Sequence, residues 1–226
     1  MTIFPKEFMW GSATASYQIE GAFDEDGRGM SIWDTFSKTP GRVANGDTGD
    51  VACDHYHRFE EDIRIAADLG LNAYRFSIAW PRLFPTADGE VNEAGFAFYN
   101  RLIDCIIAHG LEPLVTLYHW DLPQYLEDQG GWANRDTVYA YEQYVSACVD
   151  AYGDRIQQWT TLNEPWVFGW LGYNLGVHAP GKRDLPAAIA AAHHTALAHG
   201  VGTRAIRRIK PDAVVGLTLN MTNYVI

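Results

Sequence analysis

The sequence predicts an α/β protein built on a parallel sheet. Segments with the apolar and β-branched character of strands alternate with segments of helical spacing, and this alternation implies parallel strands covered by helices. Such a sheet is either doubly wound or closed into a barrel. Polar residues at or near strand ends favour the barrel, because barrel enzymes build their sites at the carboxyl ends of the strands. These residues are Gln18, Arg75, His119, Asn163 and Glu164.

Composition bounds the class of protein. The chain has 226 residues, 47% of them hydrophobic, which is enough for a large core. The formal net charge of -11 argues against nucleic-acid and anionic-membrane partners, because both attract basic surfaces. The first residues do not resemble a signal peptide, and no apolar stretch approaches membrane-spanning length. We therefore expect a cytoplasmic protein with one domain over residues 1–226.

The cysteines and histidines show no pattern of a metal site. Cys53, Cys105 and Cys148 are odd in number and widely spaced, which fits reduced thiols and neither a disulfide framework nor a zinc site. We expect them to be small buried hydrophobes. The histidine pairs lack the i, i+4 spacing of helical ligands, so we expect no metal and no cofactor. These pairs are His55 with His57 and His193 with His194.

The first third of the chain is expected to hold a strand, a loop and a helix. Residues 8–16 are short, apolar and punctuated by glycine, as in a first strand. Residues 24–50 are rich in Gly, Asp and Asn, which predicts a long functional loop over a site. From Asp54 the spacing becomes helical, and Gly70 stops the helix. Its apolar side is expected to be Phe59, Ile63, Ala66, Ala67 and Leu69.

Two strand–helix units are expected next. Residues 73–80 form the second strand, and Asn92 or Glu93 opens a helix that His109 and Gly110 close. Residues 114–118 form the third strand. A further helix over residues 136–152 ends at a glycine.

The fourth strand ends in the most informative segment, residues 159–166. Apolar and β-branched residues alternate with polar ones until Asn163 and Glu164 arrive together. Pro165 has no backbone N–H and favours an extended conformation at Glu164. The tryptophans that follow would partly desolvate the Glu164 carboxyl, raise its pKa and suit it to donate a proton. The alternative is a surface glutamate at a turn.

The rest of the chain is expected to add a loop, a helix and a strand. The loop runs through Trp170, Tyr173 and His178, and an alanine-rich helix covers residues 185–209. Residues 213–219 form a fifth strand. A dinucleotide-binding enzyme is disfavoured, because residues 27–29 hold only a fragment of the required glycine pattern, and in a loop.

Four motifs occur in a characteristic order. They are FMWGSATASYQIEG at residues 8–21, YRFSIAWPR at 74–82, YHWDLP at 118–123 and TLNEP at 161–165. Together they resemble glycoside hydrolase family 1, the β-glucosidase family, over residues 4–226. The resemblance implies a (β/α)8 TIM barrel, of which this chain supplies about the first five strands. It also implies a retaining β-glycosidase that hydrolyses β-glucosides or related β-glycosides, with a β-linked glucoside or oligosaccharide as substrate.

The same resemblance implies residue roles. Glu164 matches the acid/base, and Arg75 would sit beside the nucleophile and help to keep it ionised. Asn163 would face the sugar 2-hydroxyl, where a bond that tightens in the transition state raises the rate. The substrate-binding residues would be Gln18, His119, Trp120 and Asn163.

The chain departs from the family at its nucleophile. The family uses a glutamate in a Thr-Glu-Asn-Gly type motif on the seventh strand, and no such motif occurs here. We expect the nucleophile in sequence beyond Ile226, because five strands cannot close an eight-stranded barrel. The chain would then be an inactive fragment or a partial barrel that pairs with a complementary C-terminal barrel segment. The alternative is a non-catalytic half-barrel that binds sugar weakly or not at all.

Several of these residues also have ordinary structural interpretations. Arg75 could bridge a carboxylate inside the sheet, and His119 could be a core histidine. Asp121 is expected to cap the following segment rather than to act as the nucleophile. The glycosylation pattern at residues 220–222 is expected to be incidental.

Overall fold

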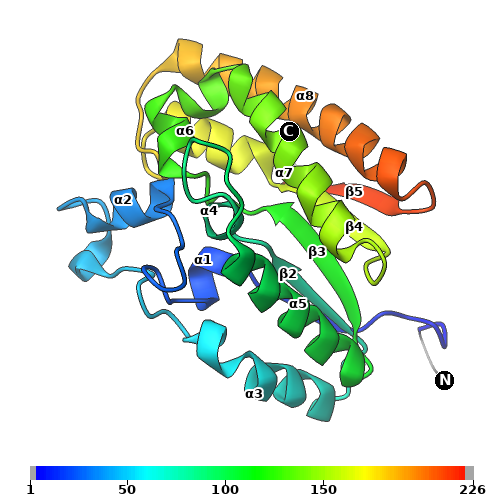
Figure 1. Cartoon of the computed structure of the whole chain (residues 1–226). Coiled ribbons are helices and arrows are strands. Elements are labelled where there is room, and N and C mark those ends of the chain that lie inside the picture. Colours follow the sequence, from blue (N-terminus) through cyan, green and yellow to red (C-terminus); the bar gives the residue numbers. More distant parts are fainter. Residues whose placement is uncertain (1–3, 222–226) are drawn as a thin grey trace, which may run out of the picture.

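The computed structural model describes residues 4–221. Within them, one sheet of five parallel strands follows chain order, with each strand beside the next (Figure 1). The strands are β1 (Gly11–Ala13), β2 (Ala73–Ser77), β3 (Glu112–Tyr118), β4 (Gln158–Asn163) and β5 (Val214–Thr218). This arrangement confirms the predicted parallel sheet, and its sequential strand order is that of a barrel rather than of a doubly wound sheet.

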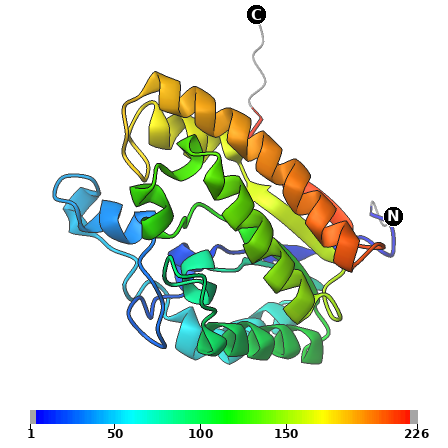
Figure 2. The same cartoon turned by 45° about the horizontal axis from the view of Figure 1, so that its top comes forward.

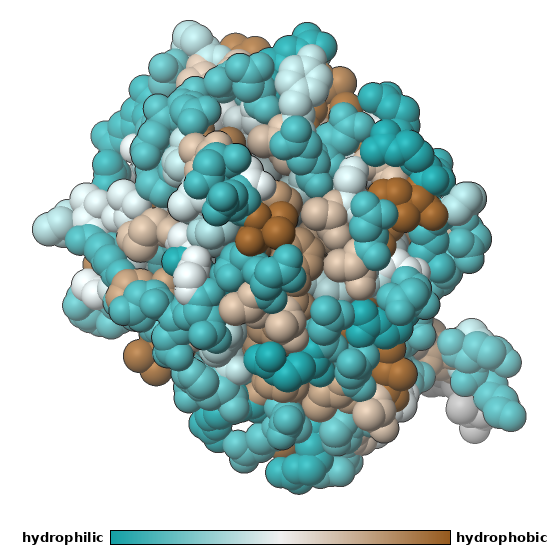
Figure 3. Space-filling view, viewed as in Figure 1, coloured by the Kyte–Doolittle hydropathy of each residue, from teal (hydrophilic) through white to brown (hydrophobic). Residues whose placement is uncertain are grey.

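Helices connect successive strands. The long ones are α3 (His55–Asp68), α5 (Glu93–Ala108), α7 (Asp136–Tyr152) and α8 (Leu185–Ile209). The short ones are α1 (Ser16–Ile19), α2 (Ile32–Lys38), η1 (Ala44–Gly46), α4 (Trp80–Leu83), α6 (Gln124–Asp128), η2 (Gly131–Ala133) and the π-helix η3 (Val167–Gly172). The long helices lie on one side of the sheet, where α3 packs beside α5 and α7 beside α8 (Figures 1 and 2). Their outer face is largely hydrophilic (Figure 3).

The sheet is open at both ends within residues 4–221. β1 pairs only with β2 there, and β5 only with β4. The residues of β1 are exposed, and Val214 at the start of β5 is 59% exposed. Because a barrel closes only when its first and last strands pair, the described residues form an incomplete (β/α) barrel.

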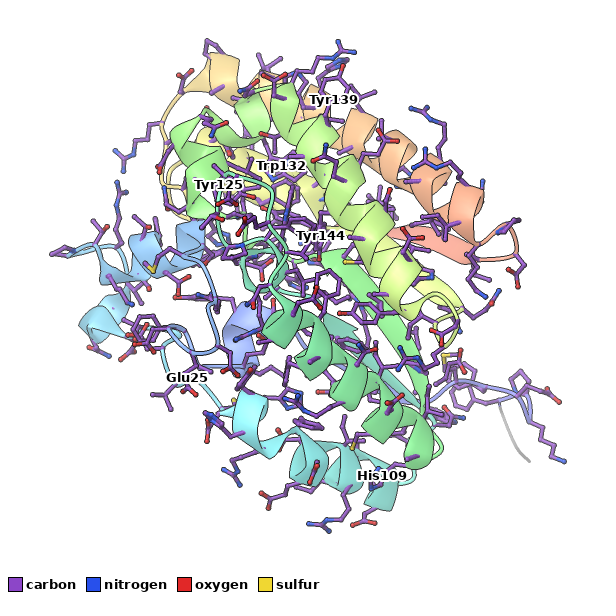
Figure 4. The ribbon with its side chains drawn as sticks, viewed as in Figure 1. Glu25, His109, Tyr125, Trp132, Tyr139 and Tyr144 are labelled. Atoms are coloured by element: carbon purple, nitrogen blue, oxygen red, sulfur yellow. The ribbon has the colours of Figure 1, made fainter. Side chains whose placement is uncertain are left out.

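Aromatic side chains fill the space between the helices and the sheet. Tyr144 of α7 and Trp132 of η2 are fully buried and lie at this junction (Figure 4). The Tyr144 hydroxyl shares its one hydrogen between the carbonyl oxygens of Leu117 and Ile78, which lie 2.6 and 3.1 Å away. These bonds link α7 to the backbone at the carboxyl ends of β3 and β2, so the buried tyrosine helps to hold the two strand ends that carry polar residues.

The expected long loop over residues 24–50 is wrong in part, because it contains α2. The helix begins with a capping box: the Ser31 hydroxyl accepts from Asp34 N, and the Asp34 carboxylate accepts from Ser31 N. Asp34 is buried and pairs with Arg28 over 2.9 Å. The Ser-x-x-Asp signal was present in the sequence, but the surrounding Gly and Asp residues obscured it.

Other differences are local. Leu69 is 74% exposed and does not join the apolar side of α3, because it follows the last helical residue. The expected loop after Glu164 contains η3. Of the cysteines, only Cys148 is buried, whereas Cys105 is half-buried and Cys53 is exposed. The glycosylation pattern at residues 220–222 ends on a residue outside the described range.

Among residues 4–221, no helix combines the length and the apolar character that crossing a membrane requires.

Candidate active site

Four polar side chains, in or directly after the neighbouring strands β2, β3 and β4, form a hydrogen-bonded chain. Arg75 in β2 donates from Nη2 to Asn163 Oδ1 over 2.6 Å and from Nε to Thr116 Oγ1 over 2.8 Å. Asn163 ends β4, and its Nδ2 lies 3.2 Å from His119 Nε2. His119 directly follows β3. The parallel register of β2, β3 and β4 thus brings together side chains that lie up to 88 residues apart in sequence.

Charge and burial determine which nitrogen and oxygen atoms donate and accept in this hydrogen-bonded chain of side chains. Burial, and after it the Arg75 charge, lowers the pKa of His119 to about 4, so its imidazole is neutral near pH 7. Arg75 has only donors and therefore binds the oxygen of the Asn163 amide, which turns the amide nitrogen toward His119. Asn163 then donates to His119 Nε2. The Arg75 contacts are to a hydroxyl and an amide, so the interpretation of Arg75 as a bridge to a carboxylate inside the sheet is wrong.

A hydrogen bond of the Trp120 side chain joins the turn after β3 to the carboxyl end of β4. Its indole Nε1 donates to the Asn163 carbonyl over 2.8 Å. Its backbone φ is 78°, in the left-handed region that residues with a side chain rarely adopt. The Trp120 ring lies 4.9 Å from the His119 ring and 5.7 Å from that of His178. A strained backbone held by a tertiary contact is typical of functional sites.

Glu164 departs from the expected extended backbone. Its φ is 52°, again left-handed, although the residue precedes Pro165. Its N–H donates to the Thr218 carbonyl of β5 over 2.9 Å, and its carbonyl accepts from Val167 N over 2.9 Å. The tertiary contact with Thr218 and the local turn closed by Val167 together outweigh the preference of a residue before proline. The backbone of Glu164 is therefore fixed between two strand ends and the start of η3.

The Glu164 side chain is partly open and lies near the charge of Arg75. Glu164 is half-buried, while Trp166 beside it is 55% exposed. Burial lowers the pKa of the Arg75 guanidinium, and the charge of Glu164 opposes that shift. The two side chains are thus close enough to interact electrostatically, and Glu164 stays accessible to a ligand.

A cavity of about 340 Å³ lies beside the hydrogen-bonded side chains of Arg75, Asn163 and His119. Gln18, His119 and Trp120 all line it, whereas Arg75, Asn163 and Glu164 do not. Its other lining residues are Tyr17, Trp33, Ser37, Val43, Asp47, Thr48, Gly49 and Ala52. A cavity of this size with a few polar groups among aromatic ones fits a small polar ligand.

Sequence reasoning did not identify Tyr17, Trp33 or Thr116 as site residues. Tyr17 stands beside Gln18 in the first motif, which was a usable signal. Trp33 belongs to α2, which was expected to be loop, and its ring lies 6.0 Å from that of Tyr17. Thr116 lies inside a buried strand, and only its hydrogen bond to Arg75 connects it to the site.

Asp121 does not cap the segment that follows it, which corrects the sequence-based expectation. Its side chain is fully buried, and Oδ2 accepts from Ser16 Oγ over 2.5 Å. Burial raises the pKa of this carboxyl to about 7, and the Ser16 hydrogen bond opposes the shift. Another buried carboxylate, Glu20, binds Arg82 Nε over 3.2 Å and the Tyr99 hydroxyl over 2.6 Å.

Comparison with known proteins agrees with this geometry. The family model for glycosyl hydrolase family 1 matches residues 1–225. The chain belongs to this family. It is 52% identical to β-glucosidase A of Acetivibrio thermocellus over 221 residues, which is 98% of this chain and 49% of that protein. It is also 52% identical to β-glucosidase A of Thermotoga maritima over 96% of this chain and 49% of that protein.

Solved structures of the family superimpose closely. An enzyme from Alicyclobacillus herbarius gives a TM-score of 0.95 with 54% identity, over 97% of this chain and 49% of its own. The Thermotoga maritima β-glucosidase bound to noeuromycin gives 0.94 with 52% identity, over 96% of this chain and 49% of its own. The family 1 chain described here spans about half the length of the relatives it matches, and its five strands form an incomplete TIM barrel.

Proposed function

We propose that this chain supplies the acid/base half of a retaining β-glycosidase that hydrolyses β-glucosides or related β-glycosides. The observation that carries the proposal is the Asn163 amide, held in one orientation by Arg75 and directly followed by Glu164. An oriented amide beside an accessible carboxyl suits a sugar site in which one group binds a hydroxyl and the other moves a proton. The β-glucosidases among the relatives support the substrate class.

Glu164 would act first as an acid and then as a base. In the first step it donates its proton to the glycosidic oxygen while the bond from that oxygen to the anomeric carbon breaks, and a second carboxylate attacks that carbon. In the second step the Glu164 carboxylate takes a proton from water, whose oxygen attacks the anomeric carbon and releases the second carboxylate. Bond making and bond breaking balance in each step.

The other side chains would hold the sugar. Asn163 would bind the 2-hydroxyl, where a hydrogen bond that strengthens in the transition state lowers the barrier. Gln18 and His119 would bind further hydroxyls, and Trp120 would line the pocket. His119 is neutral near pH 7 and its Nε2 already accepts from Asn163, so the ring carries its proton on Nδ1 and would donate from there to a sugar hydroxyl.

The second carboxylate would come from a complementary C-terminal barrel segment that pairs with the open edges of β1 and β5. The four carboxylates buried within residues 4–221 are already engaged. Asp121 binds Ser16, Glu20 binds Arg82 and Tyr99, Asp34 binds Arg28, and Glu127 binds Tyr173 and Lys182. Arg75 carries positive charge at the site, and this charge would favour the ionised form of an incoming nucleophile.

The test is hydrolysis of an aryl β-glucoside by this chain, alone and after co-expression with the C-terminal half of the Thermotoga maritima relative. We call this combination the completed chain. We expect no turnover by the chain alone and turnover by the completed chain that Glu164→Gln slows. The matched control is Glu61→Gln on the exposed face of α3. A completed chain that assembles but stays inactive would support the non-catalytic alternative, and turnover unaffected by Glu164→Gln would reject the role of Glu164.

A further inference from the structure

We propose that Asp121 is a positioning residue for the sugar-binding side chains Gln18, His119 and Trp120. The inference rests on the proposed function, because it concerns the residues expected to hold the sugar. Asp121 does not face the cavity and touches none of the expected reacting groups. It would act through Ser16, by fixing the short helix that carries Gln18 against the turn that carries the other two residues.

The contacts form a buried bridge across three parts of the fold. Asp121 Oδ2 accepts from Ser16 Oγ over 2.5 Å, and these residues lie 105 positions apart. Ser77 Oγ, at the end of β2, donates to Ser16 Oγ over 3.1 Å and accepts from Ser16 N over 2.7 Å. All three side chains are at most 2% exposed. The bridge thus joins the end of β2, the start of α1 and the turn after β3.

The helix that carries Gln18 depends on this bridge. α1 has four residues, and the residue before it, Ala15, makes no side-chain cap. A helix this short is not stable by itself, since nucleation costs more than one turn of hydrogen bonds returns. Ser16 is its first residue and is held on both sides by Ser77 and Asp121. Gln18, two residues later, is exposed at the rim of the cavity, so its placement follows that of Ser16.

The turn after β3 depends on the bridge as well. Trp120 has the left-handed φ of 78°, a conformation that is unfavourable for a residue with a Cβ. Two contacts hold it there, one on each side. Its own indole donates to the Asn163 carbonyl, and the next residue, Asp121, is anchored to Ser16. Loss of the second contact would let the turn relax and move the Trp120 and His119 rings.

The direct test measures the Trp120 indole and the Gln18 amide by proton–nitrogen NMR in the purified chain. Trp120→Phe and Gln18→Glu identify the two signals. We expect Ser16→Ala and Asp121→Ala to shift both signals and to speed hydrogen exchange of the Trp120 indole at least about 10-fold. Asp121→Asn keeps an oxygen that can accept from Ser16 and should restore much of the native spectrum. Thr195→Val, which alters a buried hydroxyl on α8, is the control and should leave both signals in place.

Kinetics of the completed chain provide the functional test. We expect Asp121→Ala and Ser16→Ala each to lower kcat/KM on an aryl β-glucoside about 10- to 100-fold. The double variant should fall little further, because both changes break the same bond. If Asp121→Ala does not fold, Ser16→Ala removes the bond from the other side and decides the matter.

The outcomes separate the two proposals. Unchanged Trp120 and Gln18 signals in a folded Ser16→Ala chain would overturn the positioning role whatever the activity. Additive losses of kcat/KM in the double variant would overturn it as well. An unmutated completed chain without turnover would reject the proposed function, while the NMR comparison would still test the role of Asp121.

Discussion

Asn163 donates from Nδ2 to His119 Nε2 over 3.2 Å while its Oδ1 accepts from Arg75 over 2.6 Å. The amide therefore has one orientation, and the orientation is set by a residue two strands away. An amide is otherwise free to turn over, because its two ends are nearly equal in size. The geometry that would present Asn163 to a sugar hydroxyl is thus determined by Arg75 as much as by Asn163 itself.

Replacement of Arg75 should reduce activity without unfolding the protein. Arg75→Met removes both hydrogen bonds and the charge, so the Asn163 amide can turn and the nucleophile loses a nearby cation. We expect kcat/KM of the completed chain to fall about 100-fold, as for other misplaced catalytic groups. Steady-state kinetics measures this. Arg207→Met, at an exposed position of α8, is the control, and equal losses in both variants would contradict the role assigned to Arg75.

The stability of the chain should depend on pH through Asp121. Burial and the nearby Glu20 raise the pKa of its carboxyl from 3.8 to about 7, against the opposing effects of Ser16 and Arg28. The folded chain binds this proton more tightly than the unfolded chain, so the stabilisation is present below about pH 4 and is lost as the pH rises to about 7. The full effect is up to about 4 kcal/mol, at about 1.4 kcal/mol for each unit of pKa shift.

Asp121→Asn isolates this contribution because an amide does not titrate. We expect Tm to fall between pH 5 and pH 8 by less in Asp121→Asn than in the unmutated chain. Thermal unfolding at a series of pH values measures the difference. Parallel curves for the two proteins would show that Asp121 keeps an ordinary pKa.

The buried pair of Arg82 and Glu20 should be a large contributor to stability. Arg82 is fully buried, its Nε donates to Glu20 over 3.2 Å, and its guanidinium lies 4.3 Å from the centre of the Tyr56 ring. Arg82→Met leaves the Glu20 carboxylate buried without its partner, which costs about 3–5 kcal/mol. Urea unfolding measures this loss. Arg64→Met, which breaks the exposed pair with Asp68, should have no measurable effect.

The sequence predicted the long helices closely, but β1 and β2 are shorter than the strands expected over residues 8–16 and 73–80, and the second of these segments ends in the first residue of α4. The helices over residues 136–152 and 185–209 have the expected bounds, because long periodic segments ended by Gly153 and by Pro211 leave little ambiguity. Asn92 caps α5 as expected, where its side chain accepts from Ala94 N. The strand ends also meet as expected of a parallel sheet. Periodicity and chain breakers were sufficient for these features because each depends on neighbours in sequence.

Features that depend on distant partners were not predictable in the same way. Glu164 adopts a left-handed backbone, and its N–H binds the Thr218 carbonyl of the neighbouring strand β5, whereas the local rule for a residue before proline favours an extended one. Asp121 appeared to be a helix cap, since its true partner, Ser16, lies 105 residues earlier. The family motifs identified these segments, but not the contacts between them.

The most direct test of the proposed chemistry compares leaving groups in the completed chain with and without Glu164→Gln. Without a proton donor, a poor leaving group must depart as an anion, whereas an activated aryl group departs readily without help. We expect kcat/KM to fall about 100- to 10,000-fold for an alkyl β-glucoside or a disaccharide, and far less for a dinitrophenyl β-glucoside. Equal losses for both kinds of substrate, or no loss for either, would contradict the assignment of Glu164 as the acid.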